Sequence, residues 1–100
     1  MHAWHTEHSF RSWIYANILS AGLAFYLPIT PAQTLVIVVL GVLVLAAELF
    51  NTAIERLTDL VTQEQHELAG QAKDAGSAGV FVTSLAAGVA WVFALVGLVG

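Results

Sequence analysis

The sequence of 100 residues contains no cysteine and little charge. Without cysteine, disulfide bonds and thiolate metal sites are excluded. Only 10% of the residues are charged, whereas a soluble domain usually has about 25%. Hydrophobic residues make up 58%, and the mean hydropathy is +0.79. A chain of this length forms one domain at most, and this composition predicts an integral membrane protein.

Basic side chains are also scarce, because the sequence has only Arg11, Arg56 and Lys73 and a formal net charge of −4. Nucleic acids are bound largely through basic side chains on phosphates, so we expect no nucleic-acid partner. Residues 1–8 lack a basic stretch followed by an apolar core, so we expect no cleavable signal peptide. Residues 2–10, with Trp4 and Phe10, predict a short interfacial segment, since tryptophan favours the headgroup level.

Proline is rare, and Pro28 and Pro31 bracket a turn between apolar stretches. The stretch before this turn is near the lower limit for a spanning helix, about 17 residues. After the second apolar stretch, residues 62–71 are the most polar part of the chain and predict an aqueous loop. We therefore predict an all-α membrane protein with a single domain over residues 1–100. Its three transmembrane helices are predicted at about residues 12–28, 32–61 and 72–99.

Small residues recur at four-residue intervals in two of these predicted helices. Small side chains at this spacing favour close approach of transmembrane helices. In the first helix they are Ala16, Ser20 and Ala24, and in the third they include the pairs Ala72 with Gly76 and Ala75 with Gly79.

The three basic residues predict the orientation of the chain. Arg11 lies just before the first predicted helix, and Arg56 and Lys73 lie beside the second loop, whereas residues 27–33 contain no basic residue. Because basic residues favour the cytoplasmic side, we expect the N-terminus and the second loop to lie inside. Every charged residue then falls on or near the cytoplasmic side, where we expect any active site.

The strongest functional signal is an acidic stripe in residues 48–59. On a helix with about 100° per residue, four polar side chains fall within an arc of roughly 80°; they are Glu48, Asn51, Glu55 and Asp59. Glu48 lies deepest, because it directly follows the apolar run 35–47. An acid at that depth in a membrane is costly and indicates a functional site. Asp59 is expected in solvent, with Glu64 and Glu67.

The chemistry of these residues leaves two hypotheses open. Carboxylate and amide oxygens suit a hard cation such as Mg²⁺, and a lysine beside the metal suits a phosphate, so one hypothesis is phosphoryl transfer. The sequence has no P-loop, no kinase glycine loop and no His-Glu-x-x-His motif. Because these kinase motifs are missing, a second hypothesis stays open. In it the protein is a non-enzymatic oligomeric bundle that conducts ions or protons along the acidic stripe.

Three stretches carry a more specific resemblance. Residues 48–55, Glu-Leu-Phe-Asn-Thr-Ala-Ile-Glu, are similar to the signature E-x-x-N-[ST]-A-[IV]-E of the prokaryotic diacylglycerol kinase family. Residues 66–78, around Ala-Lys-Asp, resemble the second signature of that family, and residues 7–11 resemble its E-x-x-F-R run. The order and spacing also match, so the resemblance covers nearly the whole chain.

The resemblance implies a small homotrimeric kinase of the bacterial inner membrane. Each protomer would have three transmembrane helices, and the active sites would form between protomers at the cytoplasmic surface with ATP and Mg²⁺. The implied reaction is phosphorylation of a membrane lipid hydroxyl. The residues of the second signature are closer to the diacylglycerol type than to the undecaprenol type, so diacylglycerol is the favoured substrate. Family members carry a further amphipathic helix before the region of Trp4, which supplies an arginine and a tyrosine. We expect those two contacts to be absent or replaced.

The resemblance also implies roles for individual residues. Glu48 corresponds to the base that takes the proton of the lipid hydroxyl, and Glu7 and Glu55 correspond to the ligands of the metal on ATP. The implied nucleotide contacts are Glu7, Asn51, Glu55, Glu64, Gln65, His66, Lys73 and Asp74. The residues implied on the lipid side are Phe10, Arg11, Glu48 and Ser77.

Overall fold

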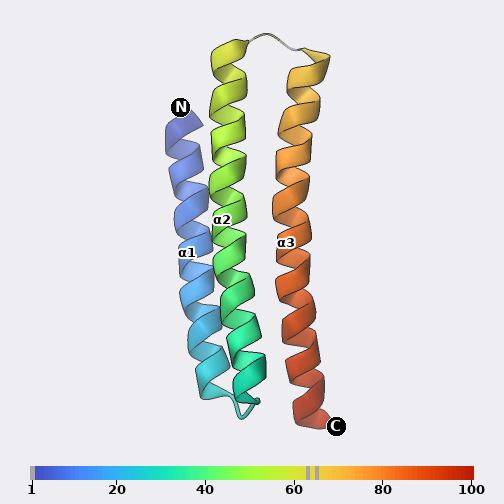
Figure 1. Ribbon diagram of the computed structural model, residues 1–100. Coiled ribbons are helices and arrows are strands. Elements are labelled where there is room, and N and C mark those ends of the chain that lie inside the picture. The colour runs from blue at the N-terminus through green and yellow to red at the C-terminus, as the bar shows by residue number, and fades with distance from the viewer. Residues whose placement is uncertain (1, 63, 65) are drawn as a thin grey trace.

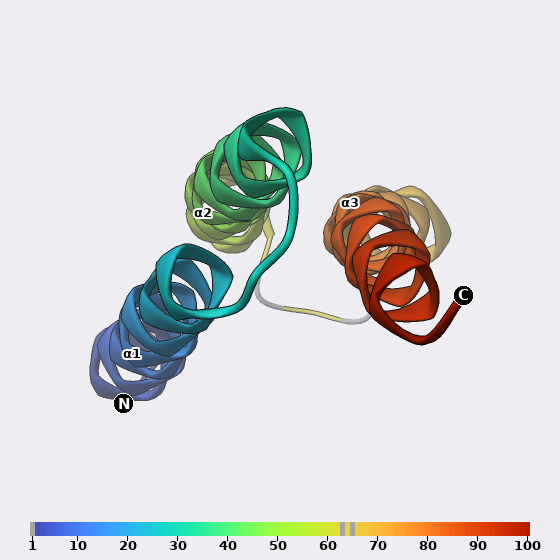
Figure 2. The same ribbon diagram turned by 90° about the horizontal axis from the view of Figure 1, so that it is seen from below.

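The computed structural model describes residues 2–62, 64 and 66–100, with side chains from Phe10 onward. This part of the chain forms three long helices, α1 (His2–Tyr26), α2 (Pro31–Val61) and α3 (Glu67–Val99). Figure 1 shows them side by side, with the start of α1 and the α2–α3 connection toward the same end. Seen along the bundle in Figure 2, the helices form a triangle, and α2 packs against both α1 and α3. The all-helical class predicted from the sequence is confirmed for the described residues.

Local sequence explains where α2 begins. The Thr30 side chain accepts a hydrogen bond from the Gln33 backbone at 3.1 Å, and the Gln33 side chain accepts one from the Thr30 backbone at 3.0 Å. This reciprocal cap satisfies two backbone N–H groups at the helix start, and Pro31 suits the first helical position. The helix then continues to Val61, so its bounds lie close to the expected range 32–61.

The structure corrects the expected start of the first helix. The interfacial segment and the helix expected at 12–28 form one continuous helix, α1, from His2 to Tyr26. Residues 2–21 contain neither glycine nor proline, so nothing in the sequence interrupts the helical hydrogen bonds there.

The start of the third helix is also corrected, from about Ala72 to Glu67. His66 caps this helix, because its Nδ1 accepts a hydrogen bond from the backbone N–H of Leu68 at 3.1 Å. Gly70 lies in the first turns without ending the helix, since a helical glycine costs only about 1 kcal/mol relative to alanine. The polar loop expected at 62–71 is therefore much shorter than its composition indicates.

Two of the three helices are long and apolar enough to cross a membrane. The most apolar windows of α2 and α3 have mean hydropathies of 2.4 and 2.2. With 31 residues α2 is about 46 Å long, which exceeds a hydrocarbon core of about 30 Å. Large apolar side chains such as Leu43, Phe50, Val82 and Phe93 are exposed on the outside of these helices. The crossing expected for residues 12–28 stays a prediction.

A line of buried side chains runs along the inner face of α2, consisting of Ile37, Val44, Glu48 and Asn51. Toward the α1–α2 connection the line is apolar, and Ile37 clusters with Ala24 of α1 and Ala94 of α3. Toward the α2–α3 connection the same line becomes polar at Glu48. The acidic stripe therefore points into the bundle as a continuation of its core.

Polar side chains link the helices within this apolar bundle. Trp91 of α3 donates a hydrogen bond to the Ser20 hydroxyl of α1 at 2.8 Å. The Asn17 amide donates to the Trp13 carbonyl at 3.0 Å, which leaves its Oδ1 against Gly41 of α2. Without a Cβ, Gly41 lets this oxygen approach the α2 backbone closely.

Replacing Gly41 by alanine is expected to destabilise the packing of α1 on α2. The added Cβ would overlap Oδ1 of Asn17, and overpacking of this kind costs about 1–3 kcal/mol. Gly88→Ala is the matched control, because a Cβ there meets no described atom within 4 Å. Thermal unfolding in detergent micelles should show a lower Tm for Gly41→Ala alone. A Tm as high as that of Gly88→Ala would contradict the overlap.

Candidate functional site

A polar hollow of about 550 Å³ opens where α2 ends and α3 begins. Asp59, Glu64 and Glu67 contribute carboxylates to its lining, and Lys73 contributes an ammonium group. Thr58 and Thr62, also in the lining, supply hydroxyl groups. The hollow therefore combines several oxygen acceptors with a cation, at the end of the bundle where the start of α1 also lies (Figure 1).

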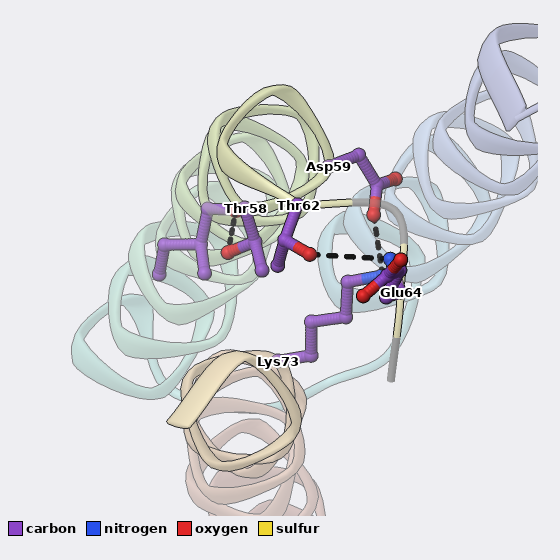
Figure 3. A network of polar contacts seen from close by, with 6 residues as sticks. Thr58, Asp59, Thr62, Glu64 and Lys73 are labelled. Atoms are coloured by element: carbon purple, nitrogen blue, oxygen red, sulfur yellow. Dashed lines mark hydrogen bonds and ion pairs between the residues drawn. The ribbon is translucent and has the colours of Figure 1, made fainter. Parts of the chain in front are cut away.

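An ion pair crosses this hollow from one helix to the other. Nζ of Lys73 lies 2.6 Å from Oδ1 of Asp59, and Figure 3 shows the two side chains converging between α2 and α3. The Lys73 side chain is 39% exposed and that of Asp59 is 28% exposed. A partly exposed pair adds only about 0.2–1 kcal/mol to stability. Its main consequence is the position of the ammonium group.

The partner of Asp59 corrects an expectation from the sequence. Asp59 was expected in solvent, yet its side chain is partly buried and paired with Lys73. The reason is that α2 and α3 run antiparallel and are joined by a short connection, so the last turns of α2 face the first turns of α3 (Figure 1). Glu64 and Glu67, grouped with Asp59 in that expectation, are exposed.

Hydrogen bonds hold the walls of the hollow. The Thr58 hydroxyl donates to the Ile54 carbonyl at 2.6 Å, and the Thr62 hydroxyl accepts from the Glu64 N–H at 3.2 Å (Figure 3). His66 lies in the lining as the cap of α3. Because its Nδ1 accepts a hydrogen bond, a neutral His66 carries its proton on Nε2.

Deeper in the bundle, Glu48 and Asn51 are only 7% and 8% exposed. Oδ1 of Asn51 is buried and has no hydrogen-bond partner among the described atoms. It lies against Gly76 of α3, where the missing Cβ makes room for it. A buried carbonyl oxygen without a donor costs about 1–3 kcal/mol. Among the described residues, this oxygen is therefore a polar atom of the helix interface whose hydrogen-bonding capacity is unused.

The stripe on α2 becomes more exposed from Glu48 toward the end of the helix. Glu48 and Asn51 are buried, and Glu55 and Asp59 are partly buried. On α3, Gly76 lies beside Asn51, and Lys73, one turn nearer the start of the helix, pairs with Asp59. Along α2, Glu55 thus lies between the buried pair Glu48 and Asn51 and the open hollow lined by Asp59.

Most of the remaining predicted site residues lie on the surface of the single chain. Phe10 is partly buried. The exposed ones are Arg11, Glu64, His66, Asp74 and Ser77. The Glu7 side chain and Gln65 lie outside the described part of the chain. Among the described side chains, no three His, Asp or Glu residues are grouped closely enough to hold a metal ion.

Sequence reasoning missed Thr58, Thr62 and Gly76 as site residues. The two threonines lie in the polar lining of the hollow, but hydroxyl residues at a helix end carry no specific signal. Gly76 did have a signal, because it belongs to a small-xxx-small pair. That spacing predicts a close helix contact, but it does not predict that Asn51 fills the space.

Comparison with known proteins adds an independent finding. The family described as "Prokaryotic diacylglycerol kinase" matches residues 1–95. A diacylglycerol kinase of Haemophilus influenzae is 36% identical over 89 residues, which cover 89% of this chain and 75% of the relative. The Escherichia coli K12 diacylglycerol kinase is 35% identical, with 89% and 73% covered. The Pseudomonas aeruginosa diacylglycerol kinase is 35% identical over 95 residues, with 95% and 77% covered.

Proposed function

Because the chain belongs to the prokaryotic diacylglycerol kinase family and is therefore a lipid kinase, we propose that it phosphorylates diacylglycerol with ATP. The observation that carries this proposal is the stripe on α2, which runs from the buried Glu48 to the polar hollow. A lipid hydroxyl lies at the membrane boundary and ATP arrives from water, so the enzyme needs functional groups at two depths. The stripe and the hollow supply them.

At the deep end, Glu48 acts as the general base. Its carboxylate takes the proton of the lipid hydroxyl while the hydroxyl oxygen bonds to the terminal phosphorus of ATP. The bond from that phosphorus to the bridging oxygen breaks, so that ADP leaves and phosphatidic acid forms. The burial of Glu48 supports this role, because it places the carboxylate inside the bundle directly after the apolar run 35–47.

At the shallow end, the hollow binds the phosphates of ATP. Lys73 provides the cation, and Asp74 and His66 form further nucleotide contacts that the family motif implies. Glu64 and Gln65 are assigned to the nucleotide by their position beside His66. The carboxylates around Lys73 would repel a bare polyphosphate, so this end of the bundle suits a nucleotide whose charge is neutralised by a metal. Phe10, Arg11 and Ser77 are assigned to the lipid side.

The oxygen atoms on the stripe fit Mg²⁺. This ion keeps several waters and is usually held by one or two carboxylates together with substrate phosphates, so it does not require a cluster of three protein ligands. Glu55 and Glu7 would hold it, and the partly buried Glu55 lies one helical turn from Asn51 on the same stripe. When bound, Mg²⁺ supplies neutralisation of the phosphate charge.

The proposed cellular setting is the one that the family resemblance implies. We assign the chain to the bacterial inner membrane as a homotrimer, with the start of α1 and the α2–α3 connection on the cytoplasmic side. The exposed apolar surfaces of α2 and α3 support contact with lipid or with other copies of the chain. The exposure of Arg11, Asp74 and Ser77 on one protomer supports a site that a neighbouring protomer completes.

The decisive experiment offers lipids separately. Purified protein in lipid vesicles receives ATP labelled on its terminal phosphate and either diacylglycerol or undecaprenol, with and without Mg²⁺. We expect label in phosphatidic acid only when Mg²⁺ is present. Label in undecaprenyl phosphate alone would overturn the proposed substrate. Label in neither lipid would overturn the kinase function and favour a non-enzymatic helical bundle.

Replacing Glu55 by glutamine is expected to raise the Mg²⁺ concentration that gives half-maximal activity by at least about tenfold, because one carboxylate ligand is lost. Glu67→Gln is the comparison variant, since it removes the same charge from the lining of the hollow but off the stripe. Its Mg²⁺ requirement should rise clearly less than that of Glu55→Gln. A Mg²⁺ titration of lipid phosphorylation measures both, and an unchanged requirement in Glu55→Gln would remove this residue from the metal site.

A further inference from the structure

The ion pair between Asp59 and Lys73 is the direct contact that joins the two walls of the hollow. Their atoms lie 2.6 Å apart, and the pair spans from the last turns of α2 to the second turn of α3 (Figure 3). Lys73 is also the only lysine of the sequence. Asp59 belongs to neither of the family signatures described above, which end at Glu55 and resume at His66.

The chemistry of the lysine side chain explains what this contact does. Lysine carries its charge on a flexible four-carbon stem, so an unpaired ammonium group samples many positions. The ammonium has three N–H donors, and one of them is directed at Oδ1 of Asp59. Among the described residues no other partner of this ammonium group is found, so two donors can serve a ligand in the hollow. The pair therefore restricts where the ammonium lies without saturating it.

We propose that Asp59 is a positioning residue, which holds the Lys73 ammonium so that its remaining N–H groups meet phosphate oxygens of the bound nucleotide. This inference rests on the proposed function for the identity of that ligand, whereas the ion pair itself does not. Protein kinases provide a physical parallel, because in them a glutamate holds the phosphate-binding lysine in place. Here the two partners come from the two arms of one helical hairpin.

The negative charge of Asp59 distinguishes a positioning role for this residue from a direct role in binding ATP. Asp59 is negative, so removing its charge reduces the repulsion of a polyphosphate and should not weaken ground-state binding of ATP. The lost restraint on Lys73 should instead slow the transfer step, for which the ammonium must be in place. Asp59→Asn is therefore expected to lower kcat by about tenfold, with a KM for ATP that is unchanged or lower.

Chemical labelling tests the ion pair independently of catalysis. An acetylating reagent modifies primary amines, so in this sequence it reports on Lys73, and mass spectrometry separates that product from the modified N-terminus. In detergent micelles without nucleotide, we expect Asp59→Asn to be acetylated at Lys73 at least about threefold faster than the wild type. The reagent reacts with the neutral amine, and without the ion pair this nitrogen is no longer held against a carboxylate. Glu67→Gln, which removes a charge from the same hollow, should react like the wild type.

The labelling results decide the proposal in two ways. Equal rates in the wild type and Asp59→Asn would overturn the ion pair as a restraint on Lys73. Saturating Mg·ATP should protect Lys73 of the wild type from acetylation, and an absence of protection would overturn the nucleotide as the ligand. These readouts do not require lipid phosphorylation, so they still decide the proposal if the wild type transfers no phosphate to lipid and the proposed function fails.

Kinetics separate positioning from a structural role. Asp59→Glu keeps the carboxylate and should recover part of the kcat that Asp59→Asn loses, while the Tm of both variants stays near that of the wild type. In a Lys73→Met background, Asp59→Asn should cause no further loss, because the residue acts through Lys73. A raised KM with unchanged kcat, or an equal further loss in that background, would overturn the proposal.

Discussion

Replacing Glu48 by glutamine should lower kcat by at least about 10³-fold while the affinity for Mg·ATP stays close to that of the wild type. Glutamine has nearly the same shape but cannot accept the proton of the lipid hydroxyl. Glu48 is buried about 16 Å along the helix axis from Asp59, so its loss should leave the hollow that receives the nucleotide intact. Single-turnover phosphorylation and equilibrium binding of Mg·ATP measure the two effects separately.

Two further measurements make this result specific. Glu48→Asp retains a carboxylate on a shorter side chain and should give an intermediate kcat, because the base is present but misplaced. The thermal unfolding of Glu48→Gln in micelles should show that the bundle remains folded. A folded Glu48→Gln variant with near-normal kcat would mean that another group accepts the proton.

The second large effect is expected from Gly76→Ala, which should lower kcat/KM by about 10²-fold. The added Cβ would overlap Oδ1 of Asn51 and would lie 3.4 Å from Cδ1 of Ile54. Asn51 is 8% exposed, so its amide has little room to turn away. It must therefore shift, or α2 and α3 must separate. A displacement of about 1 Å in a catalytic site can cost about this factor.

Gly79→Ala provides the matched control for this substitution. Gly79 lies on the same helix, but a Cβ there meets no described atom within 4 Å. Alanine should improve helix propensity by about 1 kcal/mol at either glycine, so only the contact with Asn51 distinguishes the two variants. Lipid phosphorylation and Tm are measured for both. Equal activities would show that the fit of Asn51 against Gly76 does not matter for the reaction.

Much of the site could be predicted from the sequence because it lies on one helix. Glu48, Asn51 and Glu55 are three and four residues apart, and this spacing places them on one face of any regular helix. The end of the apolar run at Ala47 set the order of their depth, and the observed burial follows that order. The assigned chemical roles remain proposals, since the motif rather than the geometry supplied them.

The expectation for Asp59 failed for a physical reason. Periodicity describes one helix at a time, and on α2 alone Asp59 lies near the end, where solvent is the default surrounding. Lys73 faces it only because α3 begins at Glu67, through the cap that His66 provides. A start at Ala72 would have left Lys73 at the edge of the loop.

The sequence by itself determined the helical class, the bounds of α2, the acidic stripe on one face of that helix and the membership of the family. Only the tertiary structure decided which side chains meet across helices, namely Asn17 with Gly41, Ser20 with Trp91, Asn51 with Gly76 and Asp59 with Lys73. Contacts within a helix follow from its fixed geometry. Contacts between helices depend on their axial offset, which changes by about 1.5 Å for every residue gained or lost at a helix end. Because the boundary of α3 differed by five residues from its expected start, the pairs across α2 and α3 could not be read from the sequence.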